Sequence, residues 1–319
     1  MSGLNDMKRS MHVCGAGLAL VFFLAAAPSL LAQSMAAETL QQKVSLPNQV
    51  EPPTPATTSD QELGEIGVVQ KFPKPETLTA STSQQFFYTD NVFYTNTHQV
   101  GSTAYLGTYT ASYVPYSLVD WTPRATVQYN MARYGSAAAG DFDNENLMLS
   151  SQYIFSGDRA WSWTAAIDLS RFTNPHQNDH EFYQEVVYDN QITHVQQLLK
   201  DAPLYFVAAY DLAYHQANPS NYDRLDNSLS FSLAYYPVES VSIGPFVRPS
   251  ARTYVTNGVG QNDRDDFNLS EGFDITWKPW KYVSLSADFL HTNDYSNNSG
   301  QSYNNTAPGL SVTGTVKFW

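Results

Sequence analysis

The chain has 319 residues, a formal net charge of −13 and only 15% charged residues, whereas aromatic residues reach 14%. A chain this acidic repels phosphate, so nucleic acid is excluded as a partner that long-range attraction would recruit. The charged fraction is well below the usual value of about 25%, and the combination of few charges with many rings is typical of a lipid-facing surface.

The first 36 residues have the layout of a secretory signal peptide. Lys8 and Arg9 precede an apolar run over 15–31, and the small residues Ala32 and Ala36 follow it. The alternative is a retained membrane anchor, but Pro28 interrupts the run and cleavage is favoured. The only cysteine, Cys14, lies in this segment, so the exported chain is expected to hold itself together without disulfides.

Residues 37–76 are rich in proline, with prolines at positions 47, 52, 53, 55, 73 and 75. This density is incompatible with a regular helix or a paired strand, so we expect an extended periplasmic linker.

Residues 77–319 alternate between apolar and small polar side chains. In "WSWTAAIDLS", for example, Trp163 and Ile167 share one face while Thr164 and Asp168 share the other. A soluble sheet would place Lys and Glu on its polar face, but here Ser, Thr, Asn and Gly predominate. The pattern predicts an all-β fold, an antiparallel transmembrane β-barrel with a hydrated interior.

The breaks in the pattern predict about twelve strands, near 80–94, 102–117, 122–134, 144–156, 160–172, 181–194, 203–215, 225–237, 241–255, 265–278, 281–293 and 308–319. Short and long connections alternate, which is typical of outer-membrane barrels and places both termini in the periplasm. Pro245 and Pro249 predict a bulge or a local break in the ninth strand.

Aromatic residues gather beside the short turns. We expect them to form the periplasmic aromatic girdle, which the sequence assigns to Trp121, Trp161, Tyr205, Trp277, Trp280, Tyr282, Phe318 and Trp319.

The closing segment "GLSVTGTVKFW" is amphipathic and ends on aromatic rings, and residues 77–319 resemble Gram-negative outer-membrane β-barrel proteins. The resemblance implies an outer-membrane location, contact with membrane lipid and lipopolysaccharide, and recognition by the barrel-assembly machinery. One departure is that the apolar phase runs through Phe318, so Trp319 is out of phase. The stretch "QQFFYTDNVFYT", through Tyr88, Asp90, Asn91, Val92 and Phe93, is similar to the first strand of β-barrel porins of the second family.

The sequence carries no serine-elbow or H-E-x-x-H motif, so we expect no enzyme and no cofactor. His215 and His291 are the only candidates for catalysis. The stretches "HQNDHE" and "GDFDNEN" contain ligand-like side chains, but solvated outer loops are favoured over a metal site.

The most informative charges share the polar phase of the strands and are predicted to line the lumen: Arg124, Asp168, Asp211, Asp226, Arg248, Arg252, Asp274 and Asp288. Two interpretations stay open. The first is a monomeric porin-like channel for small polar solutes, which favours cations because five aspartates face three arginines. The second is a plugged structural or adhesive barrel whose long outer loops bind partners.

Overall fold

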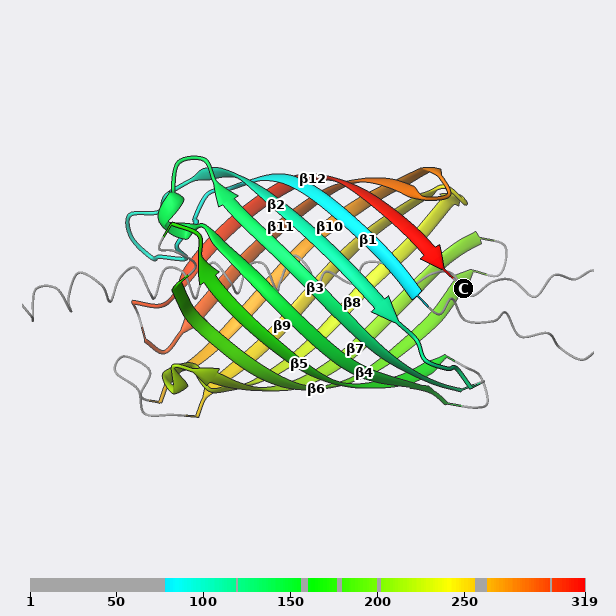
Figure 1. Ribbon diagram of the computed structural model, residues 1–319, viewed down its shortest axis with the longest axis horizontal. Coiled ribbons are helices and arrows are strands. Elements are labelled where there is room, and N and C mark those ends of the chain that lie inside the picture. Colours follow the sequence, from blue (N-terminus) through cyan, green and yellow to red (C-terminus); the bar gives the residue numbers. More distant parts are fainter. Residues whose placement is uncertain are drawn as a thin grey trace, which may run out of the picture.

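A computed structural model describes residues 78–118, 120–155, 160–176, 180–199, 202–255, 263–298 and 300–318. Over these residues the chain forms a closed antiparallel barrel of twelve strands, as the alternation predicted (Figure 1). The expected signal peptide (1–36), the linker (37–76) and Trp319 lie outside the described residues. Within them, no helix has the length and apolar character needed to cross a membrane.

The strands are β1 (Leu78–Thr89), β2 (Ser102–Tyr113), β3 (Trp121–Tyr134), β4 (Phe142–Ile154), β5 (Trp161–Asn174), β6 (His180–Leu199), β7 (Ala202–Asn218), β8 (Arg224–Val238), β9 (Val241–Tyr254), β10 (Asp265–Trp280), β11 (Val283–Ser296) and β12 (Tyr303–Phe318). Two short 3₁₀ helices, η2 (Ala138–Gly140) and η3 (Ser220–Tyr222), lie in the β3–β4 and β7–β8 connections.

Every strand pairs with its neighbour in sequence, and β1 closes the sheet by pairing with β12. The closing register runs from Leu78 opposite Phe318 to Phe87 opposite Gly309. Closure leaves no edge strand with unpaired backbone groups, which is the condition for placing a sheet in hydrocarbon.

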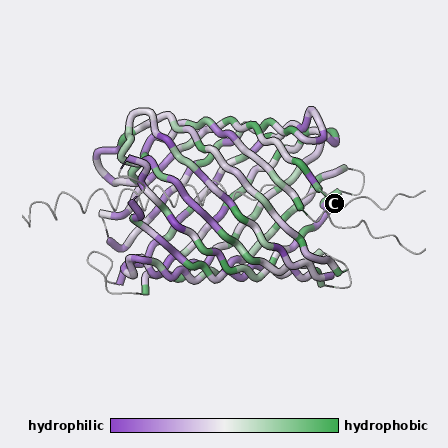
Figure 2. The backbone as a smooth tube through the Cα atoms, viewed as in Figure 1, coloured by the Kyte–Doolittle hydropathy of each residue, from purple (hydrophilic) through white to green (hydrophobic). Residues whose placement is uncertain are grey.

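The two ends of the barrel differ. One end, here called the loop end, carries long connections such as 90–101; the other, the turn end, carries short ones such as 239–240 between β8 and β9. Figure 2 shows hydrophilic residues collected at the loop end, while hydrophobic residues recur along the strands. The start of β1 and the end of β12 meet at the turn end, because their terminal residues are register partners.

The predicted first strand was too long. β1 ends at Thr89, whereas residues 90–94 turn back into the loop end instead of extending the ladder. Tyr94 has a φ of 51°, which no strand residue adopts. The Asn91 amide holds the turn by donating to Thr95 O at 3.0 Å and to Asn304 O at 2.9 Å. β12, conversely, begins at Tyr303, earlier than the predicted position 308.

The two prolines of β9 disturb the sheet on one side only. Pro245 and Pro249 lie opposite Phe273 and Leu269 in an unbroken ladder with β10. The pairing with β8 is interrupted opposite both prolines, since a proline has no N–H to donate there. The predicted break is therefore confined to the β8–β9 ladder, and β9 itself continues through it.

Strand alternation separates an outer from an inner face. On β12, Leu310 and Val312 point outward with exposed fractions of 64% and 49%, whereas Ala307 points inward and is fully buried. Exposed aliphatic side chains of this kind match a lipid environment.

An apolar cluster fills part of the interior at the loop end. It includes Phe87, Val92, Leu106, Tyr134, Phe142, Phe172 and Tyr183, all buried. Val92 comes from the folded β1–β2 loop, so this loop contributes to the interior packing. The cluster leaves the β8–β11 side of the loop end to polar residues.

The end-to-end asymmetry predicts the orientation in the membrane. A specific protease site inserted after Gly300, in the β11–β12 connection, is expected to be cleaved on intact cells, because long loops of such barrels face outward. The same site inserted between Lys281 and Tyr282, in the β10–β11 turn, is the matched control and should be cut only after permeabilisation. The reverse pattern would contradict the assignment of the loop end to the outside.

Candidate functional site: the charged lumen cavity

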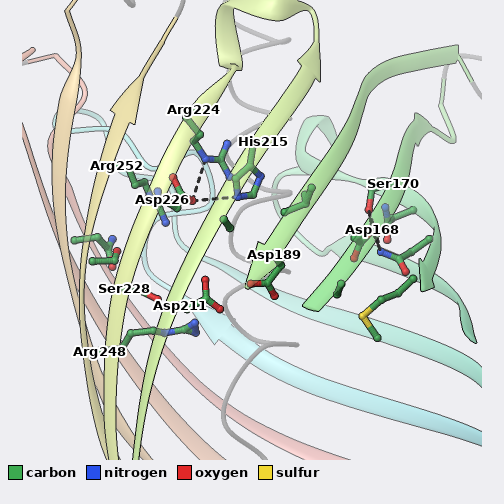
Figure 3. A pocket seen from close by; sticks show the side chains of 18 of the residues that line it. Asp168, Ser170, Asp189, Asp211, His215, Arg224, Asp226, Ser228, Arg248 and Arg252 are labelled. Atoms are coloured by element: carbon green, nitrogen blue, oxygen red, sulfur yellow. Dashed lines mark hydrogen bonds and ion pairs between the residues drawn. The ribbon is translucent and has the colours of Figure 1, made fainter. Parts of the chain in front are cut away.

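The barrel interior contains a cavity of about 420 Å³. Inward-facing residues from β3 to β10 line it, and most of them are polar. Figure 3 shows its charged residues, with Asp211 between Asp189 and Arg248. A volume of this size falls within the range of about 300–1,000 Å³ that is usual for small-molecule sites.

Three aspartates on consecutive strands form the acidic wall of the cavity: Asp168 on β5, Asp189 on β6 and Asp211 on β7. Asp168 Oδ1 accepts hydrogen bonds from Asn146 Nδ2 at 2.5 Å and from Ser170 Oγ at 3.1 Å. Asp211 Oδ2 accepts a long hydrogen bond, 3.5 Å, from Gln191 Nε2. Among the described residues, the buried Oδ1 atom of Asp189 has no hydrogen-bond donor.

Arg248 and Arg252 project into the same cavity from β9. They share the inner face because they are four residues apart on one strand. Arg248 lies close enough to Asp211 for the two charges to interact. Ser250 lies between Arg248 and Arg252 on the inner face of β9, and its register partner on β8 is Ser228.

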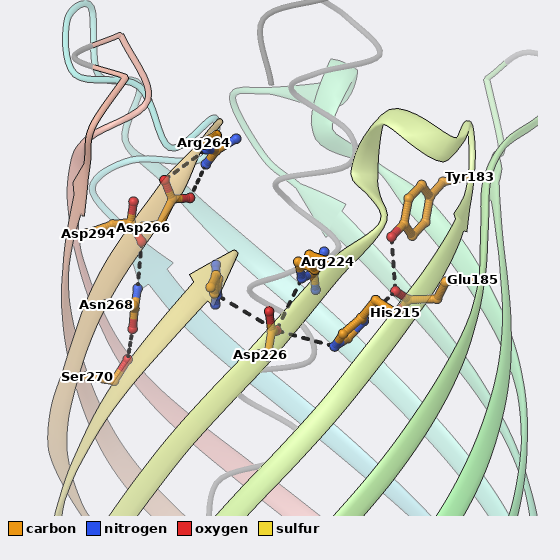
Figure 4. A network of polar contacts seen from close by, with 11 residues as sticks. Tyr183, Glu185, His215, Arg224, Asp226, Arg264, Asp266, Asn268, Ser270 and Asp294 are labelled. Carbon is orange, nitrogen blue, oxygen red and sulfur yellow. Dashed lines mark hydrogen bonds and ion pairs between the residues drawn. The ribbon is translucent and has the colours of Figure 1, made fainter. Parts of the chain in front are cut away.

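Towards the loop end, His215 is clamped between two carboxylates (Figure 4). Its Nδ1 lies 3.0 Å from Glu185 Oε2 and its Nε2 lies 3.3 Å from Asp226 Oδ2. Tyr183 Oη donates to Glu185 Oε2 at 3.0 Å, and Arg224 Nε donates to Asp226 Oδ2 at 3.2 Å. Glu185 and His215 are almost inaccessible, with side-chain exposures of 1% and 8%, so these charges depend on one another.

A second polar network lines the neighbouring wall at the loop end. Arg264 is ion-paired with Asp266, Asn268 Nδ2 donates to Asp294 Oδ1 at 3.3 Å, and Ser270 Oγ donates to Asn268 Oδ1 at 2.9 Å. These hydrogen bonds satisfy polar groups that close packing has removed from solvent.

Asp274 and Asp288 lie on another part of the inner wall. They are direct register partners on β10 and β11, and Gln85 Nε2 donates to Asp288 Oδ1 at 2.8 Å. Glycines flank the pair: a Cβ on Gly244 would lie 2.7 Å from Asp274 Oδ1, and one on Gly309 would lie 2.8 Å from Asp288 Oδ1. A Cβ at either position would therefore force the facing carboxylate to shift.

The structure places all eight charged residues assigned to the lumen on inward faces, but not at one site. Asp168, Asp211, Asp226, Arg248 and Arg252 line the cavity. Asp274 and Asp288 form the separate pair, and Arg124 is exposed near the turn end of β3. Whether they line a conducting path stays a prediction.

Most aromatic residues assigned to the girdle lie exposed near the turn end, namely Trp161, Trp277, Trp280, Tyr282 and Phe318. Trp121 is half-buried, and its Nε1 donates to Ser151 Oγ at 2.5 Å. Tyr205 differs, because it shares the inner face of β7 with Val207 and Asp211. Its ring packs edge-on against the ring of Tyr236, with 6.1 Å between the ring centroids. Alternation along β7 thus removes Tyr205 from the lipid-facing girdle.

The two ligand-like stretches meet, but through ion pairs. Asp141 pairs with His176 Nε2 at 2.7 Å, whereas Asp143 pairs with Arg133 at 2.6 Å and Glu145 with Arg171 at 3.6 Å. His180 and Glu181 belong to β6, and Asp179 lies outside the described residues. No group of three or more His, Cys, Asp or Glu suited to a metal ion occurs within the described part of the chain. His291, on the outer face, bonds Thr306 Oγ1 at 3.0 Å.

Sequence reasoning missed Asp189, Glu185 and Arg224. Both faces of β6 mix apolar and polar residues, so alternation in "FYQEVVYDNQIT" could not show which face is inward. Arg224 is the first residue of β8 and looked like part of a loop. Their roles depend on contacts between strands, which a single segment does not reveal.

No family model matches this sequence, and no curated protein matches it. Among solved structures, the fold is similar to an outer-membrane channel from Pseudomonas putida, with a TM-score of 0.54 and 12% identity over 79% of this chain and 99% of that one. The translocator domain of the autotransporter NalP from Neisseria meningitidis aligns at a TM-score of 0.43 and 12% identity, covering 90% and 99% of the two chains. The NanC porin aligns at 0.41 and 9% identity, covering 73% and 98%. At these identities the likeness extends to the fold alone.

The clamped histidine predicts a stability effect. Changing His215→Leu leaves Glu185 and Asp226 without the imidazole between them, and the free energy of unfolding should fall by about 3 kcal/mol or more. Heat-modifiable gel mobility of the refolded barrel would measure the loss. Gln216→Leu, on the exposed face of the same strand, is the control and should change stability by about 0.5 kcal/mol or less. Equal stability of the two variants would show that the clamp contributes nothing.

Proposed function

We propose that this chain is an outer-membrane barrel that acts as a porin-like channel for small polar solutes and favours cations. The observation that carries the proposal is the polar cavity inside the barrel, about 420 Å³ in volume and lined by charged side chains from β5 to β9. A barrel filled only for stability has no need for charged groups around such a space, because apolar packing avoids their desolvation cost.

The proposed cation preference follows from the balance of charge near the middle of the strands. Asp168, Asp189, Asp211, Asp274 and Asp288 all lie away from their strand ends, while Arg248 is the cation at comparable depth on β9. Arg224 and Arg252 lie nearer the loop end and face Asp226, at 3.2 Å and 4.0 Å. Rings of acidic side chains select cations in narrow pores, since the low-dielectric wall magnifies their field.

The second candidate is a plugged barrel with a structural or adhesive role. It is favoured by the folded β1–β2 loop, which buries Asn91 and Val92 against the apolar cluster at the loop end. A solute entering from that end would have to pass beside this cluster. The two candidates thus differ in whether the polar side of the loop end remains passable.

Several finer features belong to the same proposal. We infer export by a cleaved signal peptide, a periplasmic linker, contact with outer-membrane lipid and lipopolysaccharide, delivery by the barrel-assembly machinery, a monomeric state and no enzymatic activity. Kinship with porins of the second family rests on Tyr88, Asp90, Asn91, Val92 and Phe93 alone, and all of these but Tyr88 belong to the folded loop and not to β1.

Conductance in planar bilayers tests the proposal. The refolded protein should give steady ohmic steps, whereas a silent but correctly folded barrel would contradict a channel. Asn91→Ala removes the three side-chain bonds that fix the β1–β2 loop, so conductance should rise if this loop narrows the path. Thr97→Ala, exposed in the same loop, is the control. If the wild type is silent and the Asn91→Ala variant conducts, the protein belongs to the plugged class.

Selectivity gives a separate test. Asp211→Asn removes one charge from the cavity at nearly constant volume, so the reversal potential in a salt gradient should move toward zero. Asp265→Asn removes the same charge from an exposed position at the loop end of β10 and should leave the potential unchanged. An unshifted potential in Asp211→Asn, with conductance intact, would show that Asp211 does not shape the path.

A further inference from the structure

We propose that the lumen cavity is a binding subsite for a small zwitterionic solute, one that carries an ammonium group and a carboxylate separated by a short apolar stem. The inference rests on the proposed channel function and names the class of solute. It is carried by the division of the cavity into an acidic wall, a basic wall and an apolar strip.

The acidic wall has an acceptor that lacks a donor. Asp189 Oδ1 is buried, lines the cavity and has no hydrogen-bond donor within the described residues. Asp226 Oδ1, on the neighbouring strand β8, lacks a donor there too, although Asp226 Oδ2 is paired with His215, Arg224 and Arg252. Asp211 lies beside Asp189, close enough for the two carboxylates to repel each other, and accepts a long hydrogen bond from Gln191. Buried acceptors of this kind are costly when unsatisfied. An ammonium group offers three hydrogen-bond donors and a positive charge. It would therefore supply the missing donor and also offset the repulsion between the carboxylates.

The basic wall lies on β9, two strands from Asp211 on β7. Arg248 projects from β9 into the cavity, with the hydroxyls of Ser228 and Ser250 beside it. A guanidinium has five donors in a planar fork that matches a carboxylate, so Arg248 can bind one while retaining other contacts.

The spacing of the two walls sets the length of the solute. β7, which carries Asp211, and β9, which carries Arg248, are separated by β8, so their backbones lie about 10 Å apart at the usual strand spacing. The side chains of Asp211 and Arg248 both project into the cavity, so the distance between the carboxylate and the guanidinium is shorter than the distance between the backbones. A stem of a few methylene groups between ammonium and carboxylate fits this arrangement.

The remaining lining favours an apolar stem. Met148, Phe172, Val187 and Ala213 also border the cavity, on β4 to β7, the side that carries the acidic wall. A simple cation has no carboxylate to offer the guanidinium fork of Arg248, and a simple anion would face the three aspartates. A zwitterion avoids both penalties.

Three probes of matched length test this inference on the refolded full-length protein in detergent at neutral pH. They are δ-aminovalerate, which carries both charges, pentylamine, which carries only the ammonium, and valerate, which carries only the carboxylate. Isothermal titration calorimetry should show δ-aminovalerate binding at least about tenfold more tightly than either single-charge probe, because two charge-assisted contacts replace one.

Two variants separate the walls. Asp189→Asn should remove the advantage of δ-aminovalerate over valerate, and Arg248→Gln should remove its advantage over pentylamine. Should Arg248→Gln fail to refold, Arg248→Lys keeps the charge, loses the fork and should reduce the advantage over pentylamine. Asp265→Asn, outside the cavity, should bind all probes as the wild type does.

Equal affinity of the wild type for δ-aminovalerate and pentylamine, or an unchanged preference in both cavity variants, would overturn the inference. Its failure differs from failure of the channel proposal. Conductance without zwitterion preference would retain the channel and reject the subsite, whereas zwitterion binding by a silent barrel would retain the subsite and reject the channel.

Discussion

The pairing of β1 with β12 is the interaction on which the rest of the structure depends. It joins the two ends of the described chain along the ladder from Leu78–Phe318 to Phe87–Gly309 and leaves no strand edge. In hydrocarbon, each unpaired backbone donor or acceptor costs several kcal/mol, so an open sheet of this length could not remain in a membrane. Closure also fixes which side of every strand faces inward.

Once the sheet is closed, the interior must satisfy its own polar groups. The loop end does so in two ways. On one side the apolar cluster around Phe142 and Phe172 packs as in a soluble core. On the other side His215, Glu185, Asp226 and Arg224 neutralise one another in a network with little access to solvent. These two arrangements divide the loop end between an apolar and a charged part.

The middle of the barrel is different because its charges are only partly neutralised. The acidic wall of β5–β7 faces the cavity together with Arg248, and the Asp274–Asp288 pair occupies another part of the wall with glycines on both flanks. Like charges on opposed residues destabilise a sheet unless water or a ligand offsets them. Stability alone does not require these charges, because apolar packing would avoid their desolvation cost; their retention therefore supports the proposed channel function.

The fold could be predicted from the sequence because its main signal lies within each strand. Alternation between apolar and polar residues reports which face of a strand meets lipid, and it repeats within each strand, so twelve strands and their inward charges could be read one segment at a time. Proline, glycine and asparagine at the breaks likewise indicated the positions of the short turns and the long connections. The prediction failed in β6, where both faces mix apolar and polar residues, so that Asp189 was missed. It also failed at Asn91, where a strand-like stretch folds into the β1–β2 loop.

Tertiary structure alone decided which inward charges meet. Asp168, Asp189, Asp211 and Arg248 come from four different strands, and His215 finds its two carboxylates on β6 and β8. These contacts depend on the register between strands and on the tilt that accumulates around the closed sheet, so a slip of one residue would exchange the faces. The sequence by itself determined a barrel with a charged interior. The closed register determined that part of this interior is a cavity with acidic and basic walls, because only pairing between distant segments sets the distance between their side chains.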